Sequence, residues 1–171
     1  MKTIKTISFA FIIAFFSTSL AAQEFQVPQN VTLQNESDFK NYESDVVNAV
    51  TWLENTPVNQ QSAKRKEVNT FLLQWMTGTP TISIDLGEFQ TGLTADNPDL
   101  LVMYLAGWSK FAIENPAEKD NKLMCNLAAV KSVLNLYSNN LGKGISKNKK
   151  IEKLLKMDES KLQAYVQKEI K

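Results

Sequence analysis

Four carboxylate side chains with the chemistry of a cation site or an acid/base pair lie close together in the sequence: Asp85, Glu88, Asp96 and Asp99. Carboxylate oxygens bind hard cations such as calcium, and two carboxyls can act as acid and base on a glycosidic bond. The spacing matches no calcium-binding loop. Aspartate is also common in turns and at helix starts, and Asp99 follows the helix-start pair Asn97 and Pro98. We therefore expect structural roles for these residues, with a cation site or an acid/base pair as the alternative.

The sequence contains no histidine and one cysteine, Cys125. It therefore cannot build Ser-His-Asp or Cys-His catalysis, nor a zinc site of imidazoles or several thiolates. We expect no metal centre of this kind and no cofactor. The lone thiol cannot close an internal disulfide. Alanines share its helical face and favour burial, whereas an exposed thiol would indicate a disulfide between two chains.

The C-terminal end of the chain is strongly basic. Residues 143–171 hold 9 lysines and 4 acidic residues, whereas residues 23–142 hold 8 basic and 14 acidic residues. A basic amphipathic end of this kind can attach to an anionic surface. We expect a surface that binds an anionic envelope component or an acidic protein partner, made of Lys147, Lys149, Lys150, Lys153 and Lys156. The alternative is that these lysines are solvated or pair with the acidic remainder of the chain. The apolar residues between them are expected to face inward: Ile151, Leu154 and Leu155.

The N-terminus has the pattern of a secretory signal peptide. Lys2 and Lys5 precede an apolar run over residues 7–16, and small residues follow as far as Ala22. The apolar run is shorter than the ~20 residues that a membrane-spanning helix needs. We therefore expect residues 1–22 to be a cleaved signal peptide, and the mature chain to reach the periplasm or the medium with no transmembrane segment. A small secreted chain without a disulfide framework is typical of bacteria, and in that compartment nucleic acid is not an expected partner.

Terminal sequencing of the exported protein tests the signal peptide. The mature chain is expected to begin at Ala22 or Gln23, since small residues precede both cleavage points. An exported chain that still begins at Met1 would contradict this prediction.

Helical periodicity organises the remaining sequence. Residues 23–36 show no period and predict an extended lead-in to a single all-helical domain over residues 37–171. Apolar spacing, caps and stop signals predict about six helices, at residues 37–55, 62–77, 98–115, 119–139, 146–157 and 158–170. Residues 81–86 alternate like a strand, but no second strand is available to pair with them. The sequence therefore predicts an all-α compact bundle with one short extended segment and no substantial sheet.

The predicted central helix spans residues 98–115. Apolar residues cover most of its circumference, which is typical of a helix buried on several sides. Trp108 and Phe111 are expected in the core, and Lys110 on the narrow polar arc. Gly107 costs ~1 kcal/mol relative to alanine inside a helix, so it indicates that another helix crosses closely.

Two function classes remain. The basic end and the lack of a nucleophile–base pair favour an exported binding or scaffolding protein of the bacterial envelope. The alternative is a carboxylate-based hydrolase that acts on an envelope polysaccharide through the acidic residues between positions 85 and 99.

Overall fold

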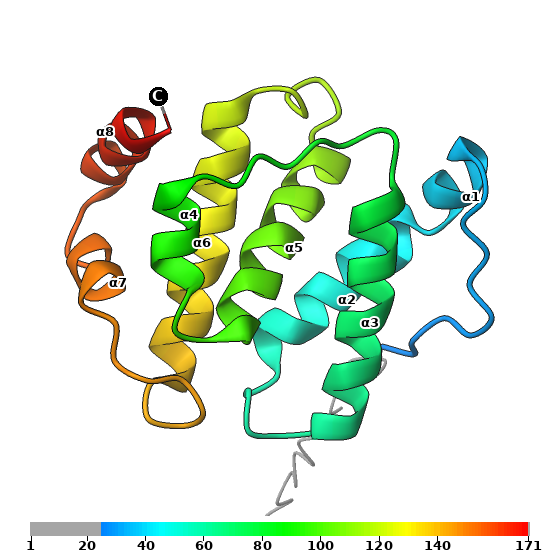
Figure 1. Ribbon diagram of the computed structural model, residues 1–171, viewed down its shortest axis with the longest axis horizontal. Helices are drawn as coiled ribbons and strands as arrows, with labels where there is room; N and C mark the ends of the chain where they lie inside the picture. Colours follow the sequence, from blue (N-terminus) through cyan, green and yellow to red (C-terminus); the bar gives the residue numbers. More distant parts are fainter. Residues whose placement is uncertain (1–24, 171) are drawn as a thin grey trace, which may run out of the picture.

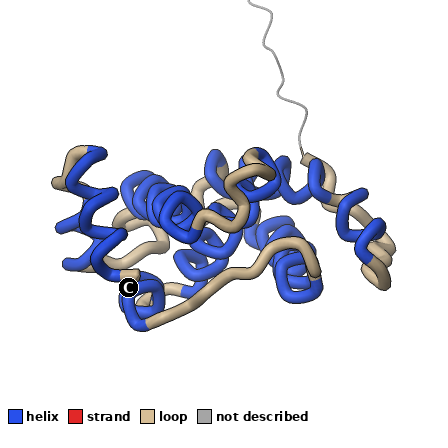
Figure 2. The backbone as a smooth tube through the Cα atoms, turned by 90° about the horizontal axis from the view of Figure 1, so that it is seen from above, coloured by secondary structure: helices blue, strands red, loops and turns tan. Residues whose placement is uncertain are grey.

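The computed structural model describes residues 25–170, and every regular segment within them is helical (Figures 1 and 2). The predicted signal peptide, residues 1–22, lies outside the described residues. The helices of the described part are α1 (Glu36–Asn41), α2 (Glu43–Asn55), α3 (Ser62–Gly78), α4 (Glu88–Thr94), α5 (Pro98–Glu114), α6 (Lys122–Asn140), α7 (Lys149–Leu154) and α8 (Glu159–Glu169). The predicted all-α fold is confirmed. Eight helices are described instead of about six because one predicted helix is divided and one was not anticipated.

Helices α5 and α6 pack against each other more extensively than any other pair. Figure 1 shows them side by side in the middle of the molecule, with α2 and α3 beside α5 and with α7 and α8 beside α6. Asn97 caps α5 by accepting from the Asp99 N–H, and Pro98 occupies the first turn. The predicted central helix is therefore confirmed with its start signal.

Helices α5 and α6 approach each other closely at Gly107. A Cβ atom at Gly107 would lie 2.7 Å from Ser132 Cβ and 3.2 Å from Ala129 Cα. Ser132 and Ala129 of α6 therefore occupy the space that a side chain at position 107 would need. The close spacing of α5 and α6 depends on the glycine at this position.

The single helix predicted over residues 37–55 is divided at Tyr42, where φ is −96° and ψ is 2°. The indole of Trp75, on α3, donates a 2.8 Å hydrogen bond to the Phe39 carbonyl. The Tyr42 ring meets the Phe71 ring of α3 edge-on, with centroids 6.1 Å apart. In a continuous helix the Phe39 carbonyl would accept from the N–H four residues later. Here it accepts from Trp75, and the Tyr42 ring packs on Phe71, so contacts from α3 stabilise the break.

A long connector joins α3 to α4 and crosses over the helices (Figure 1). Ile82 and Ile84 are half-buried against the core, whereas Leu86 is 47% exposed. The segment forms no strand, as expected for residues 81–86.

Helix α4 was not predicted, since no helix was expected between residues 77 and 98. Gln90 Oε1 accepts from the Gly87 N–H at 2.9 Å and closes the first turn, while Leu93 is buried. The helix spans only seven residues, too few to show a clear apolar period.

One side of α5 is more buried than its sequence suggested, because α2 packs on it. Ser109 is fully buried and Phe111 only half-buried. Lys110 was predicted on the polar arc, and this prediction of an exposed side chain is wrong. Its Nζ lies 2.9 Å from Glu54 Oε2 and 3.1 Å from Thr51 Oγ1, both on α2. The part of the polar arc that holds Lys110 therefore lies at the interface between α5 and α2.

The C-terminal helices follow a glycine turn. Gly142 and Gly144 have φ of 74° and 115°, conformations that favour glycine. Ile151 and Leu154 are buried as predicted, but Leu155 is 42% exposed, so its predicted inward position is wrong. The reason is that α7 ends at Leu154, and Leu155 caps it on the solvent side.

Candidate functional site

The cap of α7 determines where the basic residues lie. Asn148 Oδ1 accepts from the Lys150 and Ile151 N–H groups, so Asn148 is the cap and α7 begins later than the predicted residue 146. The Asn148 side chain is 5% exposed, and its Nδ2 donates to Asp96 at 2.9 Å. Its backbone N–H donates to the Tyr137 hydroxyl at 3.0 Å. These bonds hold the start of α7 against α6 and against the residues that precede α5.

The five predicted lysines all lie on or beside α7, but in different environments. At 100° per residue, Lys149 and Lys153 fall on the side of α7 opposite the buried Ile151 and Leu154, and Lys156 is exposed two residues beyond the helix. Within the described chain, no acidic side chain lies within ion-pair distance of Lys149 or Lys156. These two ammonium groups are therefore free for an external anion.

The other three lysines have neighbours within the protein. Lys147 Nζ is 3.5 Å from Glu152. Lys153 Nζ is 5.1 Å from the centroid of the Tyr165 ring, a cation–π contact. Lys150 lies against Gly92 of α4. The structure therefore presents one outer basic face and a second pair, Lys150 and Lys153, turned toward α4 and α8.

Lys150 and Lys153 line a pocket of about 300 Å³ between α4, α7 and α8. The remaining lining residues are apolar or acidic: Glu88, Phe89, Leu93, Leu154, Tyr165 and Glu169. Phe89 and Tyr165 meet edge-on, with centroids 6.1 Å apart. Sequence reasoning missed this pocket, because Phe89 lies between two predicted helices and Tyr165 lies 76 residues further along the chain.

A neighbouring pocket of about 380 Å³ is more polar and includes Asp85, Glu88, Lys122 and Asn126. Asp85 and Lys122 form an exposed ion pair at 2.6 Å. The hydrogen bond and charge of Asp85 raise the pKa of Lys122. Beneath this ion pair, Asn126 Oδ1 accepts a hydrogen bond from Gln90 Nε2 at 2.9 Å and another from the Tyr104 hydroxyl. Burial raises the pKa of Tyr104 well above its ordinary value, so this hydroxyl stays protonated and serves as a donor.

The four carboxylates singled out in the sequence do not form one cluster, although Asp85 and Glu88 line the same pocket. Asp85 pairs with Lys122, Asp96 accepts from Asn148, and Asp99 lies in the first turn of α5. Glu88 opens α4. No group of three or more side chains suited to a metal ion occurs within residues 25–170. Their positions match the structural roles expected of them.

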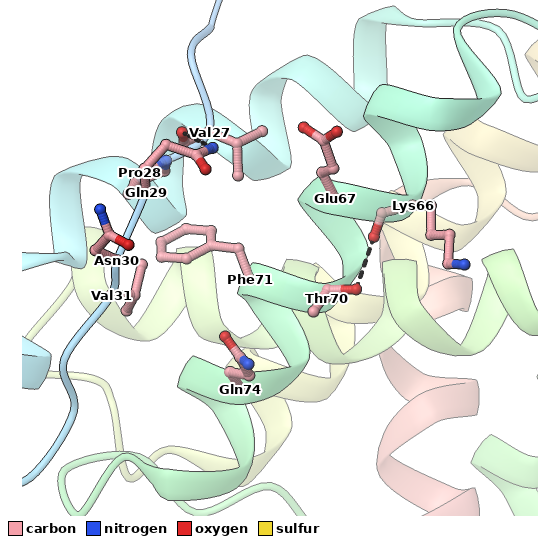
Figure 3. Close-up of a pocket in the computed structure, with 10 residues that line it drawn as sticks. All are labelled: Val27, Pro28, Gln29, Asn30, Val31, Lys66, Glu67, Thr70, Phe71 and Gln74. Atoms are coloured by element: carbon pink, nitrogen blue, oxygen red, sulfur yellow. Dashed lines mark hydrogen bonds between the residues drawn. The ribbon is translucent and has the colours of Figure 1, made fainter.

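A third pocket, of about 520 Å³, separates the segment before α1 from α3. Figure 3 shows Val27 to Val31 passing along α3 with Phe71 directed toward them. The Thr70 hydroxyl donates to the Lys66 carbonyl within α3. None of the residues singled out in the sequence lines this pocket, whose walls are the lead-in and α3.

Cys125 is fully buried near the start of α6, as its small neighbours predicted. Its Sγ lies 3.3 Å from the Lys119 carbonyl. Burial, reinforced by Asp120 and Glu118, raises the pKa of the thiol to about 11. It is therefore a protonated core residue.

No protein-family model, curated protein or solved structure matches this chain. In the described part of the chain, no helix combines the length and apolar character needed to cross a bilayer.

Proposed function

We propose that the protein is an exported binding protein of the bacterial envelope whose C-terminal end attaches to an anionic envelope component. The observation that carries the proposal is the pair of exposed lysines on the outer side of the C-terminal end, Lys149 at the start of α7 and Lys156 just beyond its last residue. Their ammonium groups share the field of one small surface, which favours anions that bear phosphate or carboxylate.

The supporting geometry is the rigid seating of α7. Asn148 is tied to Asp96 and Tyr137, so the lysines project from a fixed helix and not from a free tail. Leu155, 42% exposed beside Lys156, adds an apolar contact at the edge of the same face. A mixture of cations and one leucine suits an interface such as a lipid headgroup region.

The alternative, a carboxylate-based hydrolase, has less support. It would need two carboxyls that face each other across a cleft. Asp85 and Glu88 do line one pocket, but Asp85 is held in an ion pair with Lys122 at 2.6 Å. Asp96 is used by the cap of α7.

Cosedimentation with phosphatidylglycerol vesicles tests the basic face. The mature protein is expected to bind at low salt and to be released toward physiological salt, because surface charges are screened within ~8–10 Å. The double variant Lys149→Gln/Lys156→Gln is expected to bind about thirtyfold more weakly, since each lysine near an anionic surface contributes ~1 kcal/mol. Phosphatidylcholine vesicles are expected to bind neither protein.

The matched control is Lys40→Gln/Lys66→Gln, which removes the same charge from exposed positions on α1 and α3. Its binding should equal that of the wild type. Equal losses in the two double variants would mean that overall charge, and not the α7 face, drives attachment. Purified anionic envelope polymer in place of vesicles distinguishes a polymer from a lipid as the source of the anion.

A further inference from the structure

The pocket of about 300 Å³ between α4, α7 and α8 combines apolar and charged side chains. Its apolar part is formed by Phe89, Leu93, Leu154 and Tyr165. Leu93 and Leu154 are buried, whereas the Phe89 and Tyr165 rings are half-buried and meet edge-on at 6.1 Å. The two rings therefore keep part of their surface open beside two fixed leucines, as in the apolar walls of small-molecule sites.

Two cations and two anions line the same pocket: Lys150, Lys153, Glu88 and Glu169. Lys153 Nζ lies 5.1 Å from the centroid of the Tyr165 ring. Burial raises the pKa of the Tyr165 hydroxyl, and the neighbouring Glu169 adds to this effect through its charge and a hydrogen bond. An ammonium and a carboxylate thus lie beside one aromatic ring.

The Lys150 ammonium lies directly against α4. A Cβ atom at Gly92 would lie 2.5 Å from Lys150 Nζ, so the glycine leaves the space that the ammonium occupies. Glu88 opens the same helix, and four residues of α-helix separate positions 88 and 92 by about 6 Å. Charges of both signs are therefore close neighbours around the apolar part of the pocket.

The lysines and the glutamates of the pocket do not pair with each other. Across residues 25–170, neither Lys150 nor Lys153 has its Nζ within 4.0 Å of a carboxylate oxygen of Glu88 or Glu169. All four side chains are exposed, so their charged groups are accessible to a ligand.

This combination of charges restricts the ligands that suit the pocket. An anion or a cation alone would be attracted by two of the four charged groups and repelled by the other two. A neutral apolar molecule would displace water from four charged groups and offer them no partner. A molecule that carries a carboxylate and an ammonium close together avoids both penalties.

We infer that this pocket binds a small zwitterion with an apolar side chain, that is, a free α-amino acid such as leucine. The α-carboxylate accepts from the two lysines, the α-ammonium donates to the two glutamates, and the side chain contacts Phe89 and Tyr165. An α-amino acid carries all three groups on one carbon, which suits charges of both signs that surround one apolar patch. The volume of about 300 Å³ is at the lower end for ligand pockets and favours a ligand of this size.

The inference goes beyond the proposed function, because it concerns a small molecule and a different part of α7. Attachment to an anionic surface uses Lys149 and Lys156, which do not line this pocket. The variant Lys149→Gln/Lys156→Gln should therefore bind leucine as the wild type does while losing vesicle binding. Either proposal can thus fail without the other.

Titration of the folded mature protein with L-leucine near neutral pH, followed by NMR and calorimetry, tests the pocket. We expect a dissociation constant below about 5 mM and shifts in the ring signals of Phe89 and Tyr165. Leucinamide lacks the carboxylate and N-acetyl-leucine lacks the ammonium. Each should bind about tenfold more weakly than leucine, because each leaves two charged groups of the pocket without a partner. Glycine, which lacks the apolar side chain, should also bind about tenfold more weakly.

Protein variants assign the two charges of the ligand. Lys150→Gln/Lys153→Gln should weaken leucine binding about tenfold but should not weaken leucinamide binding, since leucinamide has no carboxylate for the lysines. Glu88→Gln/Glu169→Gln should weaken leucine binding about tenfold but should not weaken the binding of N-acetyl-leucine, which has no ammonium. These variants remove charges at exposed positions and no core contact, so the fold is expected to persist.

Three outcomes would overturn the inference. The first is a dissociation constant for leucine above about 5 mM. The second is equal binding of leucine, leucinamide and N-acetyl-leucine, which would leave the pocket an apolar contact only. The third is an equal loss of leucine and leucinamide binding in Lys150→Gln/Lys153→Gln, because the lysines would then act through the fold and not through the carboxylate.

Discussion

Replacing Trp108 with alanine is expected to lower the free energy of unfolding by about 3–5 kcal/mol. Trp108 is 1% exposed on the central helix, and its ring lies 6.4 Å from that of Tyr104. Removing the indole leaves a cavity between helices that are held apart by their other contacts, so neighbouring side chains can fill little of it. Urea unfolding followed by circular dichroism measures the change.

Trp108→Phe is the matched control. The indole Nε1 has no hydrogen-bond acceptor among the described residues, so phenylalanine keeps most of the apolar ring and removes an unpaired donor. We expect a loss below about 1.5 kcal/mol, in line with other conservative core exchanges. Similar losses for alanine and phenylalanine would show that the indole donor, and not the ring volume, stabilises the core.

Gly107→Ala is expected to destabilise the protein by about 1–3 kcal/mol, although alanine favours helix formation by ~1 kcal/mol over glycine. The added methyl would lie 2.7 Å from Ser132 Cβ and 3.2 Å from Ala129 Cα. Neither atom can rotate away, because both are fixed to the α6 backbone. Helices α5 and α6 must therefore separate slightly, which weakens their whole interface.

A double-mutant cycle identifies the cause. Ser132→Gly removes the Cβ that the new methyl would meet, so it should recover at least about 1 kcal/mol when combined with Gly107→Ala. Ser132→Gly alone is expected to destabilise, because its hydroxyl donates to Glu54 at 3.1 Å and glycine disfavours helix. Strictly additive effects of the two substitutions would show that the helices do not meet at this point.

Local signals in the sequence were sufficient for most helices. Asn97 with Pro98 marks the start of α5, Asp158 caps α8, and Gly78 ends α3, and each acts through the backbone of its own helix. The break at Tyr42 had no such signal. It depends on Trp75, 36 residues from the Phe39 carbonyl that it binds.

The candidate site was predictable only in part. The lysines of α7 could be singled out because they are close together in the sequence. The pocket between α4, α7 and α8 could not be predicted, since Phe89 and Tyr165 are far apart in the chain and meet only after α4 and α8 have packed. Lys110 was misplaced for the same reason: its partner, Glu54, lies on α2, 56 residues away.

Because Cys125 is buried, the rate at which its thiol is labelled reports how often the start of α6 opens. A reagent or a second thiol can reach Sγ only when the start of this helix detaches, since the side chain is fully covered and lies against the Lys119 carbonyl. The labelling rate then equals the intrinsic rate of an exposed thiol multiplied by the fraction of time that α6 is open. The proposed export would take the chain to an oxidising compartment. A disulfide-linked dimer would form there only from molecules in which Cys125 was exposed, either because α6 had opened or because folding was incomplete.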